Sequence, residues 1–422
     1  MGDILLEKFF ETWRWEEAIE NGVIKGINKG ELRKLCSPEV RNLLLDRIIT
    51  GKYDIAPPHQ VRIPKDNGDY RIVYVNENID RIFLSIVNNM LFELFPDMIH
   101  KSCKSYQKGI GCGKVVQEAS RKICETSMET SGVLGFKADL SKYFDSVPLE
   151  YIMRVFDHIE GQIGFSSIIS VLRRYYMSNI CFNTEGNLIQ HYQSLKQGCA
   201  VASFLADTML YHIDEMLSSL PGFYVRYSDD ILYIGTKTEK AMGILQRELN
   251  KMQMRLNPKK VEQLYVDKWF KFLGFTIKSD QISLSKSRIK SFQDEISNRT
   301  IKKNISYKNA VHSVNHYLYI GNGEYSWATQ VLPIINTQKD INTLNQYVMD
   351  CIRACITRKK KVGGLGCTVD KSDYTILRGT GKNVTENRRK TDKSISGYYS
   401  LGCMRNAMLT CKPVYETLVR SL

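Results

Sequence analysis

The amino-acid sequence predicts an α+β protein in which short strands, paired antiparallel, lie between helical segments. Apolar residues recur at helical spacing within residues 1–50 and again beyond residue 286, as in amphipathic helices. Between these regions, β-prone apolar runs at 61–75, 133–140 and 223–234 alternate with turn-forming residues, which is typical of strands and hairpins. The chain is therefore expected to carry a sheet in its centre and helices at both ends.

Each element follows from a local pattern. Residues 61–75 contain two short strands around Asp66-Asn67-Gly68, a favoured hairpin turn. Pro96 ends an amphipathic helix over 79–96. Residues 133–147 are a strand that runs into a turn, and Pro148 begins a helix. Further helices are expected at 200–217, 238–254, 286–298, 306–320 and 338–357, and short strands around 272–275.

Three carboxylates stand at the ends of two of these strands. Tyr227-Ser228-Asp229-Asp230 lies between apolar runs at what the pattern predicts to be a hairpin tip, and the run from Val133 reaches Asp139. Two Mg²⁺ ions about 3.5 to 4 Å apart need such a cluster of oxygen ligands to clamp an in-line phosphoryl displacement. The first hypothesis is nucleotidyl transfer, and a surface turn is the alternative for the Asp pair taken alone.

Positive charge is concentrated in the last third of the chain. The 422 residues carry a net charge of +14, and residues 281–422 hold 23 Lys and Arg against 10 Asp and Glu. This excess fits contact with a phosphate backbone, and a solvated basic face is the alternative. The RNA-binding candidates are Arg358, Lys359, Lys360, Lys361, Arg388, Arg389 and Lys390. No signal pattern or long apolar span is seen, so a cytoplasmic protein is expected.

In this order the motifs resemble those of the reverse transcriptases, over most of residues 60–280. The heptapeptide Asp139 to Asp145 resembles the first catalytic motif of that family, and Gln197 to Ala206 resembles the second, which lines nucleotide and template. Tyr227-Ser228-Asp229-Asp230 is similar to the Tyr-x-Asp-Asp box. The resemblance implies a right-hand polymerase and a catalytic triad of Asp139, Asp229 and Asp230. Two Mg²⁺ ions, or Mn²⁺, would be bound by these residues and Leu140.

The resemblance also implies roles in nucleotide binding. Lys65 and Arg71, on the first hairpin, would neutralise the triphosphate, and Gln197 and Gly198 would line its site. Phe144 would exclude a 2′-hydroxyl and so select deoxynucleotides; a core Phe on the same strand is the alternative.

Two further elements of the family have counterparts later in the chain. Lys260 would stand near the pyrophosphate leaving group as a proton donor, with Lys259 as the competing residue and a solvated charge as the alternative. Phe272, Leu273 and Gly274 resemble the primer grip, where glycine permits close approach to the primer strand. The expected parts of the chain are an N-terminal helical extension (1–55), fingers (56–135), palm (136–280), thumb (281–360) and a basic C-terminal segment (361–422).

Departures from the family pattern bear on lineage. Ala202-Ser203 stands where many intron-encoded members have Ser-Pro, and Asp207 stands where Asn is usual. Together with Ser105-Tyr106-Gln107-Lys108-Gly109, these features favour the defence-associated bacterial lineages, with class 2 fitting the length best. The resemblance then implies a noncoding RNA as template, copied from dNTPs into cDNA within an RNA–DNA duplex, in antiphage defence. Template-independent or protein-primed DNA synthesis and an RNA-binding scaffold on a polymerase fold are the alternatives.

Overall fold

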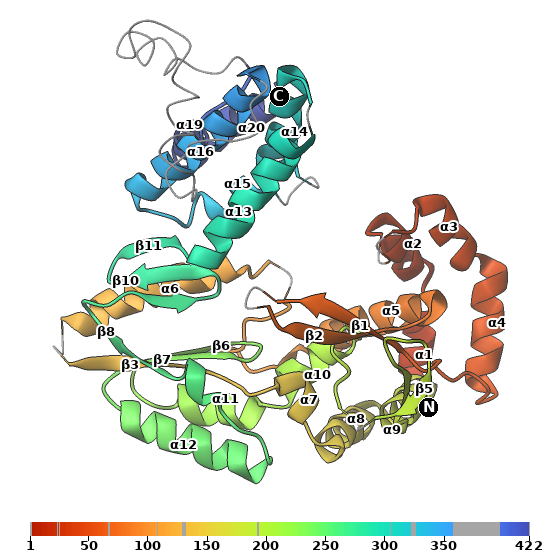
Figure 1. Cartoon of the computed structure of the whole chain (residues 1–422). Coiled ribbons are helices and arrows are strands. Elements are labelled where there is room, and N and C mark those ends of the chain that lie inside the picture. The colour runs from red at the N-terminus through yellow and green to blue at the C-terminus, as the bar shows by residue number, and fades with distance from the viewer. Residues whose placement is uncertain are drawn as a thin grey trace, which may run out of the picture. The chain divides into compact units, whose positions relative to one another are not determined.

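The computed structural model describes residues 2–22, 24, 26–65, 68–107, 109–128, 132–191, 194–303, 305–321, 326–357 and 397–421. These residues form two compact units, which are described separately. The first comprises residues up to 110 together with 133–264, and the second comprises 111–132 together with residues from 265 onward. Figure 1 shows the elements of both units.

The first unit contains a four-stranded sheet in the order β6-β7-β3-β8. Its strands are β3 (Val133–Asp139), β6 (Phe223–Tyr227), β7 (Asp230–Ile234) and β8 (Glu262–Tyr265). Strand β7 pairs antiparallel with both β6 and β3. Helices α11 (Tyr211–Ser218) and α12 (Thr238–Lys251) cover one face of this sheet (Figure 1). The predicted antiparallel sheet with a hairpin at 223–234 is confirmed.

A second sheet of this unit has the order β2-β1-β4-β5. Its strands are β1 (His59–Pro64), β2 (Tyr70–Val75), β4 (Ile180–Phe182) and β5 (Leu188–Gln190). Strands β1 and β2 form the hairpin predicted at 61–75.

Apart from the short helix η2, which has no buried residue, the remaining helices of the first unit pack around one core, in which α5 contacts α1 and α2 and α9 contacts α4. They are α1 (Ile4–Phe9), α2 (Thr12–Glu20), α3 (Lys29–Leu35), α4 (Pro38–Ile49), α5 (Asn78–Leu94), η1 (Pro96–Met98), α7 (Tyr143–Ser146), α8 (Leu149–Ile163), α9 (Ser167–Met177), α10 (Ala202–Thr208) and η2 (Pro258–Lys260).

The helix predicted over 200–217 is wrong in one respect, because α10 and α11 are separate helices. The helix is interrupted where side chains from other elements bind the backbone carbonyls of Ala206 and Asp207. Tyr143 Oη donates to the Ala206 carbonyl at 2.5 Å, and the Nη2 of Arg226 donates to the Asp207 carbonyl at 2.8 Å. A continuous helix would use these carbonyls for the amides four residues later. Contacts from other elements therefore end α10 at Thr208.

The second unit joins a small sheet, β11-β10-β9, to helices. Helix α6 (Cys112–Ser127) packs on strands β10 and β11 of this sheet. The other elements are β9 (Phe270–Phe272), β10 (Phe275–Lys278), β11 (Gln281–Leu284), α13 (Lys286–Arg299), η3 (Ile301–Lys303), α14 (Tyr307–Asn315), η4 (His316–Ile320), α15 (Trp327–Val331), α16 (Gln338–Thr357), α19 (Leu401–Thr410) and α20 (Lys412–Arg420).

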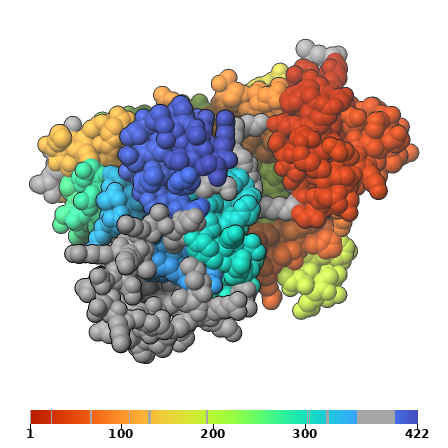
Figure 2. Space-filling model, turned by 90° about the horizontal axis from the view of Figure 1, so that it is seen from above, coloured from red at the N-terminus to blue at the C-terminus, as the bar shows by residue number. Residues whose placement is uncertain are grey.

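The helix predicted over 306–320 is α-helical only to Asn315 and continues as the π-helix η4. Here Tyr319 Oη donates to the Tyr399 carbonyl and Asn315 Nδ2 to the Gly397 carbonyl, both at 2.7 Å. These bonds hold the segment that leads into α19. Helix α19 packs on α16 and on α20, and α19 and α20 are blue in Figure 2.

Candidate active site

The three candidate carboxylates come together at one end of the first sheet. Strand β3 ends at Asp139 and β7 begins at Asp230, and these two residues are register partners. Asp229 lies in the turn between β6 and β7, and its carbonyl accepts the Leu140 amide at 3.2 Å. The Asp139 carbonyl accepts the Asn257 amide at 2.8 Å. Backbone pairing thus fixes all three residues.

Burial and mutual repulsion shape the electrostatics of this cluster. Burial raises the pKa of Asp230 to about 6, and the charges of Asp229 and Asp139 add to the rise. Burial also raises the pKa of Asp229, with Asp139 as the next cause, while Lys260 and Arg71 oppose the shift. The site is therefore one where carboxylates repel each other unless a cation lies among them.

The donor set suits Mg²⁺, because carboxylate oxygens are its preferred protein ligands. Leu140 is buried and has no side-chain donor, so only its carbonyl oxygen is a ligand candidate. Within the described ranges, no three His, Cys, Asp or Glu side chains converge closely enough to hold one ion. Instead, the Nζ of Lys260 lies 2.6 Å from Asp139 Oδ2. An ammonium thus already balances part of the charge that a metal would balance.

The structure distinguishes the two candidate lysines. Lys260 reaches Asp139, whereas the Lys259 side chain is exposed and its amide donates to Asn257 Oδ1 at 3.2 Å. Asn257 caps the short helix η2 and, through its own amide, is bonded to the carbonyl of Asp139. This connection places Lys260 beside the carboxylate.

Gln197 and Gly198 lie against the first hairpin. The Tyr74 amide on β2 donates to the Gln197 carbonyl at 2.7 Å. Gly198 has a φ of +106°, and a Cβ there would be 2.8 Å from the Tyr74 carbonyl oxygen and 3.3 Å from Val73 Cβ. No other residue fits this approach without a shift of backbone, so glycine is required at position 198.

Phe144 lies on α7, a single helical turn that follows β3. It is not on the strand, as the core alternative had supposed. The chain turns there because Lys142 adopts a left-handed conformation with φ +50°. The ring of Phe144 is half-buried and meets Tyr143 edge-on, with centroids 5.6 Å apart. Its carbonyl accepts the Leu195 amide at 3.1 Å, which ties α7 to the loop before Gln197.

Lys65 and Arg71 flank the turn of the β1–β2 hairpin. Arg71 pairs with Ile63 in the ladder, and the Lys65 amide donates to the Asp69 carbonyl at 2.7 Å. Both side chains are exposed. The positive charge of Arg71 opposes the rise that burial and Asp139 cause in the pKa of Asp229, so the structure brings Arg71 within electrostatic range of the carboxylates.

Phe272, Leu273 and Gly274 belong to the second unit. Leu273 and Gly274 have φ values of +48° and +81° and join β9 to β10, as in a tight two-residue hairpin turn. Phe272 is 1% exposed, so its side chain is part of the core. The basic candidates from Arg358 to Lys361 and from Arg388 to Lys390 lie outside the described residues.

A buried polar cluster behind the Tyr-Ser-Asp-Asp turn was not predicted. Arg226 is fully buried on β6, where its guanidinium makes bonds of 2.7 to 3.1 Å to Asp214, including Nη2 to Oδ2 at 2.7 Å. Ser105 bonds to Asp207 and, through its Oγ, accepts the Ser228 amide at 2.9 Å. A signal was available in the sequence, because an arginine in an otherwise apolar strand must be paired when buried.

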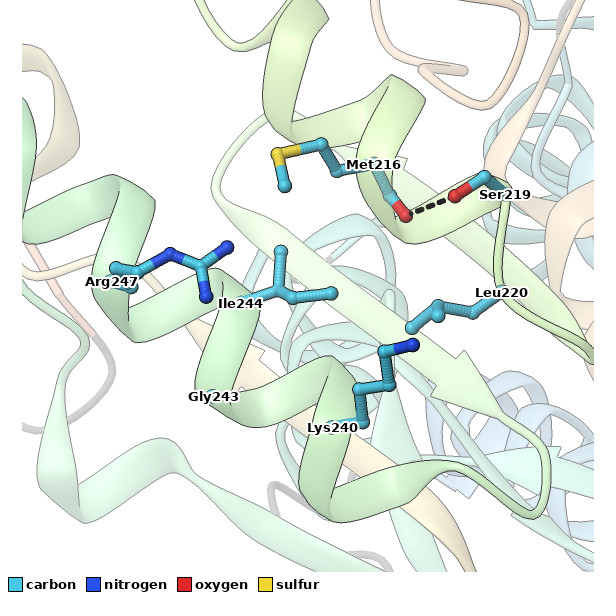
Figure 3. Close-up of a pocket in the computed structure, with 7 residues that line it drawn as sticks. All are labelled: Met216, Ser219, Leu220, Lys240, Gly243, Ile244 and Arg247. Carbon is cyan, nitrogen blue, oxygen red and sulfur yellow. Dashed lines mark hydrogen bonds between the residues drawn. The ribbon is translucent and has the colours of Figure 1, made fainter.

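A cavity of about 580 Å³ lies elsewhere in this unit, between α11 and α12 (Figure 3). It is lined by Met216, Ser219, Leu220, Lys240, Gly243, Ile244 and Arg247. None of these is a candidate catalytic residue.

Among the described helices, none is both long and apolar enough to cross a membrane.

Comparison with known proteins identifies the class. The sequence profile of the family described as "Reverse transcriptase (RNA-dependent DNA polymerase)" matches residues 63–277. The chain therefore belongs to the reverse transcriptase family, and it has the α+β right-hand polymerase fold and the enzymatic class of that family.

Individual relatives are distant. The chain is 22% identical to Protein YkfC of Escherichia coli over 293 residues, which covers 60% of this chain and 74% of that protein. It is 22% identical to the putative COX1/OXI3 intron 1 protein of Saccharomyces cerevisiae over 43% of this chain, but spans only 21% of that relative. It also resembles apo telomerase from Candida tropicalis, with 13% identity, a TM-score of 0.45 and coverage of 91% and 74% of the two chains.

Proposed function

We propose that this reverse transcriptase copies an associated noncoding RNA into cDNA by two-metal nucleotidyl transfer at Asp139, Asp229 and Asp230. The observation that carries the proposal is that strand pairing places these three residues at one end of the β6-β7-β3 sheet. When bound, two Mg²⁺ ions supply the positive charge that activates the attacking hydroxyl and stabilises the leaving pyrophosphate. Asp139, which is buried, and the partly buried Asp229 and Asp230 would hold and orient that charge.

Lys260 acts in this proposal on the leaving-group side. Its side chain is 56% exposed and its Nζ lies 2.6 Å from Asp139 Oδ2, so the side chain can turn from this carboxylate toward the phosphates when metal and nucleotide are present. A lysine ammonium there neutralises developing charge and donates a proton to the leaving oxygen. The cationic side chains of Arg71 and Lys65, both exposed on the hairpin, bind the triphosphate in this proposal.

Phe144 and the Gln197–Gly198 loop select the nucleotide in this proposal. The bond from Leu195 to the Phe144 carbonyl and the bond from Tyr74 to the Gln197 carbonyl link α7, the loop and the β1–β2 hairpin. A rigid aromatic edge at Phe144 would meet a 2′-hydroxyl, so deoxynucleotides are accepted and ribonucleotides are rejected.

The template RNA is proposed to bind the basic C-terminal third. Residues 358–396 alone contain 11 Lys and Arg against 4 Asp and Glu, and phosphate contacts of this kind are independent of sequence and sensitive to salt. The helices from α13 onward would form the thumb that follows the RNA–DNA duplex, and Leu273-Gly274 would hold the primer. The five-part division of the chain remains part of this proposal.

Charge reversal tests the RNA-binding segment. Changing Arg358, Lys359, Lys360 and Lys361 to Glu should lower RNA affinity, and it should flatten the plot of log affinity against log salt by about 0.7 per lost phosphate contact. Arg33→Glu/Lys34→Glu on the exposed face of α3 is the control. An unchanged affinity and slope would remove residues 358–361 from the interface.

We further propose that the chain acts in cytoplasmic antiphage defence, within the defence-associated and most closely the class 2 lineage. The supporting features are Ser105-Tyr106, Asp207 and the Ser of the Tyr-Ser-Asp-Asp box. The alternative enzyme is one that makes DNA without a template or from a protein hydroxyl, for which the 23 tyrosines provide candidates. An RNA-binding scaffold is the alternative from another class.

Sequencing of copurifying nucleic acid separates these functions. The protein is isolated from cells that carry the gene with its flanking DNA, as wild type and as Asp229→Ala/Asp230→Ala. One abundant RNA in both preparations, with complementary DNA only in the wild type, supports templated synthesis. DNA that matches no RNA supports the untemplated enzyme, and RNA without DNA in either preparation, even with phage present, supports the scaffold.

A further inference from the structure

The Tyr-Ser-Asp-Asp turn rests on a fully buried ion pair. Arg226, 0% exposed, binds both oxygens of Asp214, also 0% exposed, with bonds from Nε to Oδ1 at 2.8 Å and from Nη2 to Oδ2 at 2.7 Å. Tyr224 Oη donates a further bond to Asp214 Oδ1 at 2.7 Å. A buried ion pair persists only when its remaining hydrogen-bonding capacity is used. The remaining donors of Arg226 are used in this way, because Nη1 donates to the Ala206 and Ser228 carbonyls and Nη2 to the Asp207 carbonyl.

Those donors reach the turn itself. The Nη1 of Arg226 lies 3.2 Å from the Ser228 carbonyl and 3.9 Å from Asp207 Oδ1. The backbone of Arg226 also pairs with the segment ahead of Ser105, since its amide donates to the Ser102 carbonyl and its carbonyl accepts the Lys104 amide, each at 2.9 Å. Backbone hydrogen bonds thus hold the segment from Ser102 to Lys104 against strand β6, behind the turn.

Asp207 is a carboxylate without an obvious structural purpose. It is fully buried, its Oδ1 accepts the Ser105 hydroxyl, and its Oδ2 has no hydrogen-bond partner. Asp214 makes the closer contacts with Arg226, and Asp207 Oδ1 lies 3.9 Å from the same guanidinium, so Asp207 is a second buried carboxylate that shares one counter-charge, which is costly. A role in the hydrogen-bond chain from Ser228 through Ser105 to Asp207 explains why a carboxyl is tolerated at this position.

Ser228 is the residue that this chain restrains. It has φ +57°, in the left-handed region that non-glycine residues seldom adopt. All three of its polar groups are bonded: the amide to Ser105 Oγ at 2.9 Å, the carbonyl to Arg226 and the hydroxyl to Tyr106 Oη at 3.3 Å. A strained conformation of this kind persists only when its surroundings hold it.

We propose that Ser105, together with Asp207 and Arg226, is a positioning residue that holds Ser228 in the left-handed conformation and thereby aims the carboxylate of Asp229. This inference rests on the proposed role of Asp229 in metal binding. Ser105 touches neither nucleotide nor metal in this scheme, and it acts only through the backbone of the turn. The hydrogen bond from Ser228 to Ser105 thus fixes the backbone conformation of Ser228, and through it the orientation of Asp229.

The test compares Ser105→Ala with Ser166→Ala, another fully buried serine of the same unit, which caps α9. Ser105→Ala should speed hydrogen–deuterium exchange of the Ser228 amide about tenfold without metal, as expected for the loss of one buried hydrogen bond. The Mg²⁺ concentration for half-maximal primer extension should rise about tenfold, while the KM for dNTP changes less than twofold. Ser166→Ala should change neither the exchange rate nor the Mg²⁺ requirement.

A second substitution provides rescue. Glycine adopts positive φ at little cost, so Ser228→Gly in the Ser105→Ala background should recover most of the Mg²⁺ response. If Ser105→Ala does not fold, Tyr106→Phe, which removes only the bond to the Ser228 hydroxyl, should raise the Mg²⁺ requirement by a smaller factor.

Two results would overturn the positioning role: unchanged exchange at Ser228, or faster exchange with an unchanged Mg²⁺ requirement. A failure of the proposed function gives another result: Asp229→Ala/Asp230→Ala would retain DNA synthesis, independently of the rate of hydrogen–deuterium exchange at the Ser228 amide.

Discussion

Replacement of Gly198 by alanine tests how the Gln197–Gly198 loop is held. In the structure Gly198 has φ +106°, and an added Cβ would lie 2.8 Å from the Tyr74 carbonyl oxygen and 3.2 Å from the Tyr74 nitrogen. Both neighbours are backbone atoms of a paired strand, which cannot rotate away. The loop must therefore move, and the bond of 2.7 Å from the Tyr74 amide to the Gln197 carbonyl must lengthen.

The expected cost has two parts. A non-glycine residue at a disfavoured positive φ costs about 1–3 kcal/mol. Loss of the hydrogen bond between Tyr74 and Gln197 adds about 0.5–1.5 kcal/mol. We expect Gly198→Ala to lower the free energy of unfolding by about 2–4 kcal/mol, and to raise the KM for dNTP about tenfold for each 1.4 kcal/mol of lost nucleotide binding.

Two other glycines separate the contributions. Gly186 has φ +83° but open space around it, so Gly186→Ala should cost only the strain of about 1–2 kcal/mol and leave the KM unchanged. Gly161 lies within α8 with nothing near its missing Cβ, so Gly161→Ala should stabilise by about 0.5–1 kcal/mol. Urea unfolding and steady-state incorporation on one primer–template measure all three. A loss below about 1 kcal/mol for Gly198→Ala, with normal KM, would refute the close-approach argument.

Other predictions concern charged groups. Lys260→Ala should lower single-turnover incorporation about 100-fold and Lys259→Ala less than twofold; equal effects would contradict the assignment that the Asp139 contact supports. Asp214→Asn should cost about 3–5 kcal/mol in urea unfolding because Arg226 loses its closest counter-charge and keeps only Asp207 Oδ1 at 3.9 Å. A cost below about 1 kcal/mol would show that the other contacts of Arg226 suffice. Burial raises the pKa of Asp207 from 3.8 to about 6, so its contribution to stability is present below about pH 4 and is lost as the pH rises to about 6. The stability of Asp207→Asn relative to the wild type should therefore rise by about 1–3 kcal/mol between pH 4 and 7. Parallel plots of the free energy of unfolding against pH for the two proteins would exclude this titration.

The parts of the fold that depend on neighbouring residues were predictable from the sequence. The hairpins at 59–75 and 223–234 follow from alternating apolar residues around a short turn, and the helix α5 follows from its apolar spacing and Pro96. For the same reason the carboxylates could be expected on strand ends. Their register, with Asp139 opposite Asp230, depends on strand pairing across some ninety residues and needed the structure.

Features set by distant contacts could not be predicted. The break between α10 and α11 arises because Arg226 and Tyr143 bind carbonyls of α10, and no local pattern encodes this. The choice of Lys260 over Lys259 depends on how Asn257 is tied to Asp139. Helix α6 was not predicted from the sequence, and it packs on β10 and β11, strands that follow it by about 150 residues.

Primer extension with purified full-length protein tests the central claim most directly. The reaction contains a defined RNA template, a DNA primer, dNTPs and Mg²⁺, and it compares the wild type with Asp229→Ala/Asp230→Ala and with Asp139→Asn. The account predicts DNA complementary to the RNA from the wild type, none after chelation of Mg²⁺, and at least a 1,000-fold loss in both variants, about 4 kcal/mol of transition-state stabilisation. Templated synthesis that survives in either variant would contradict the assignment of catalysis to these three carboxylates.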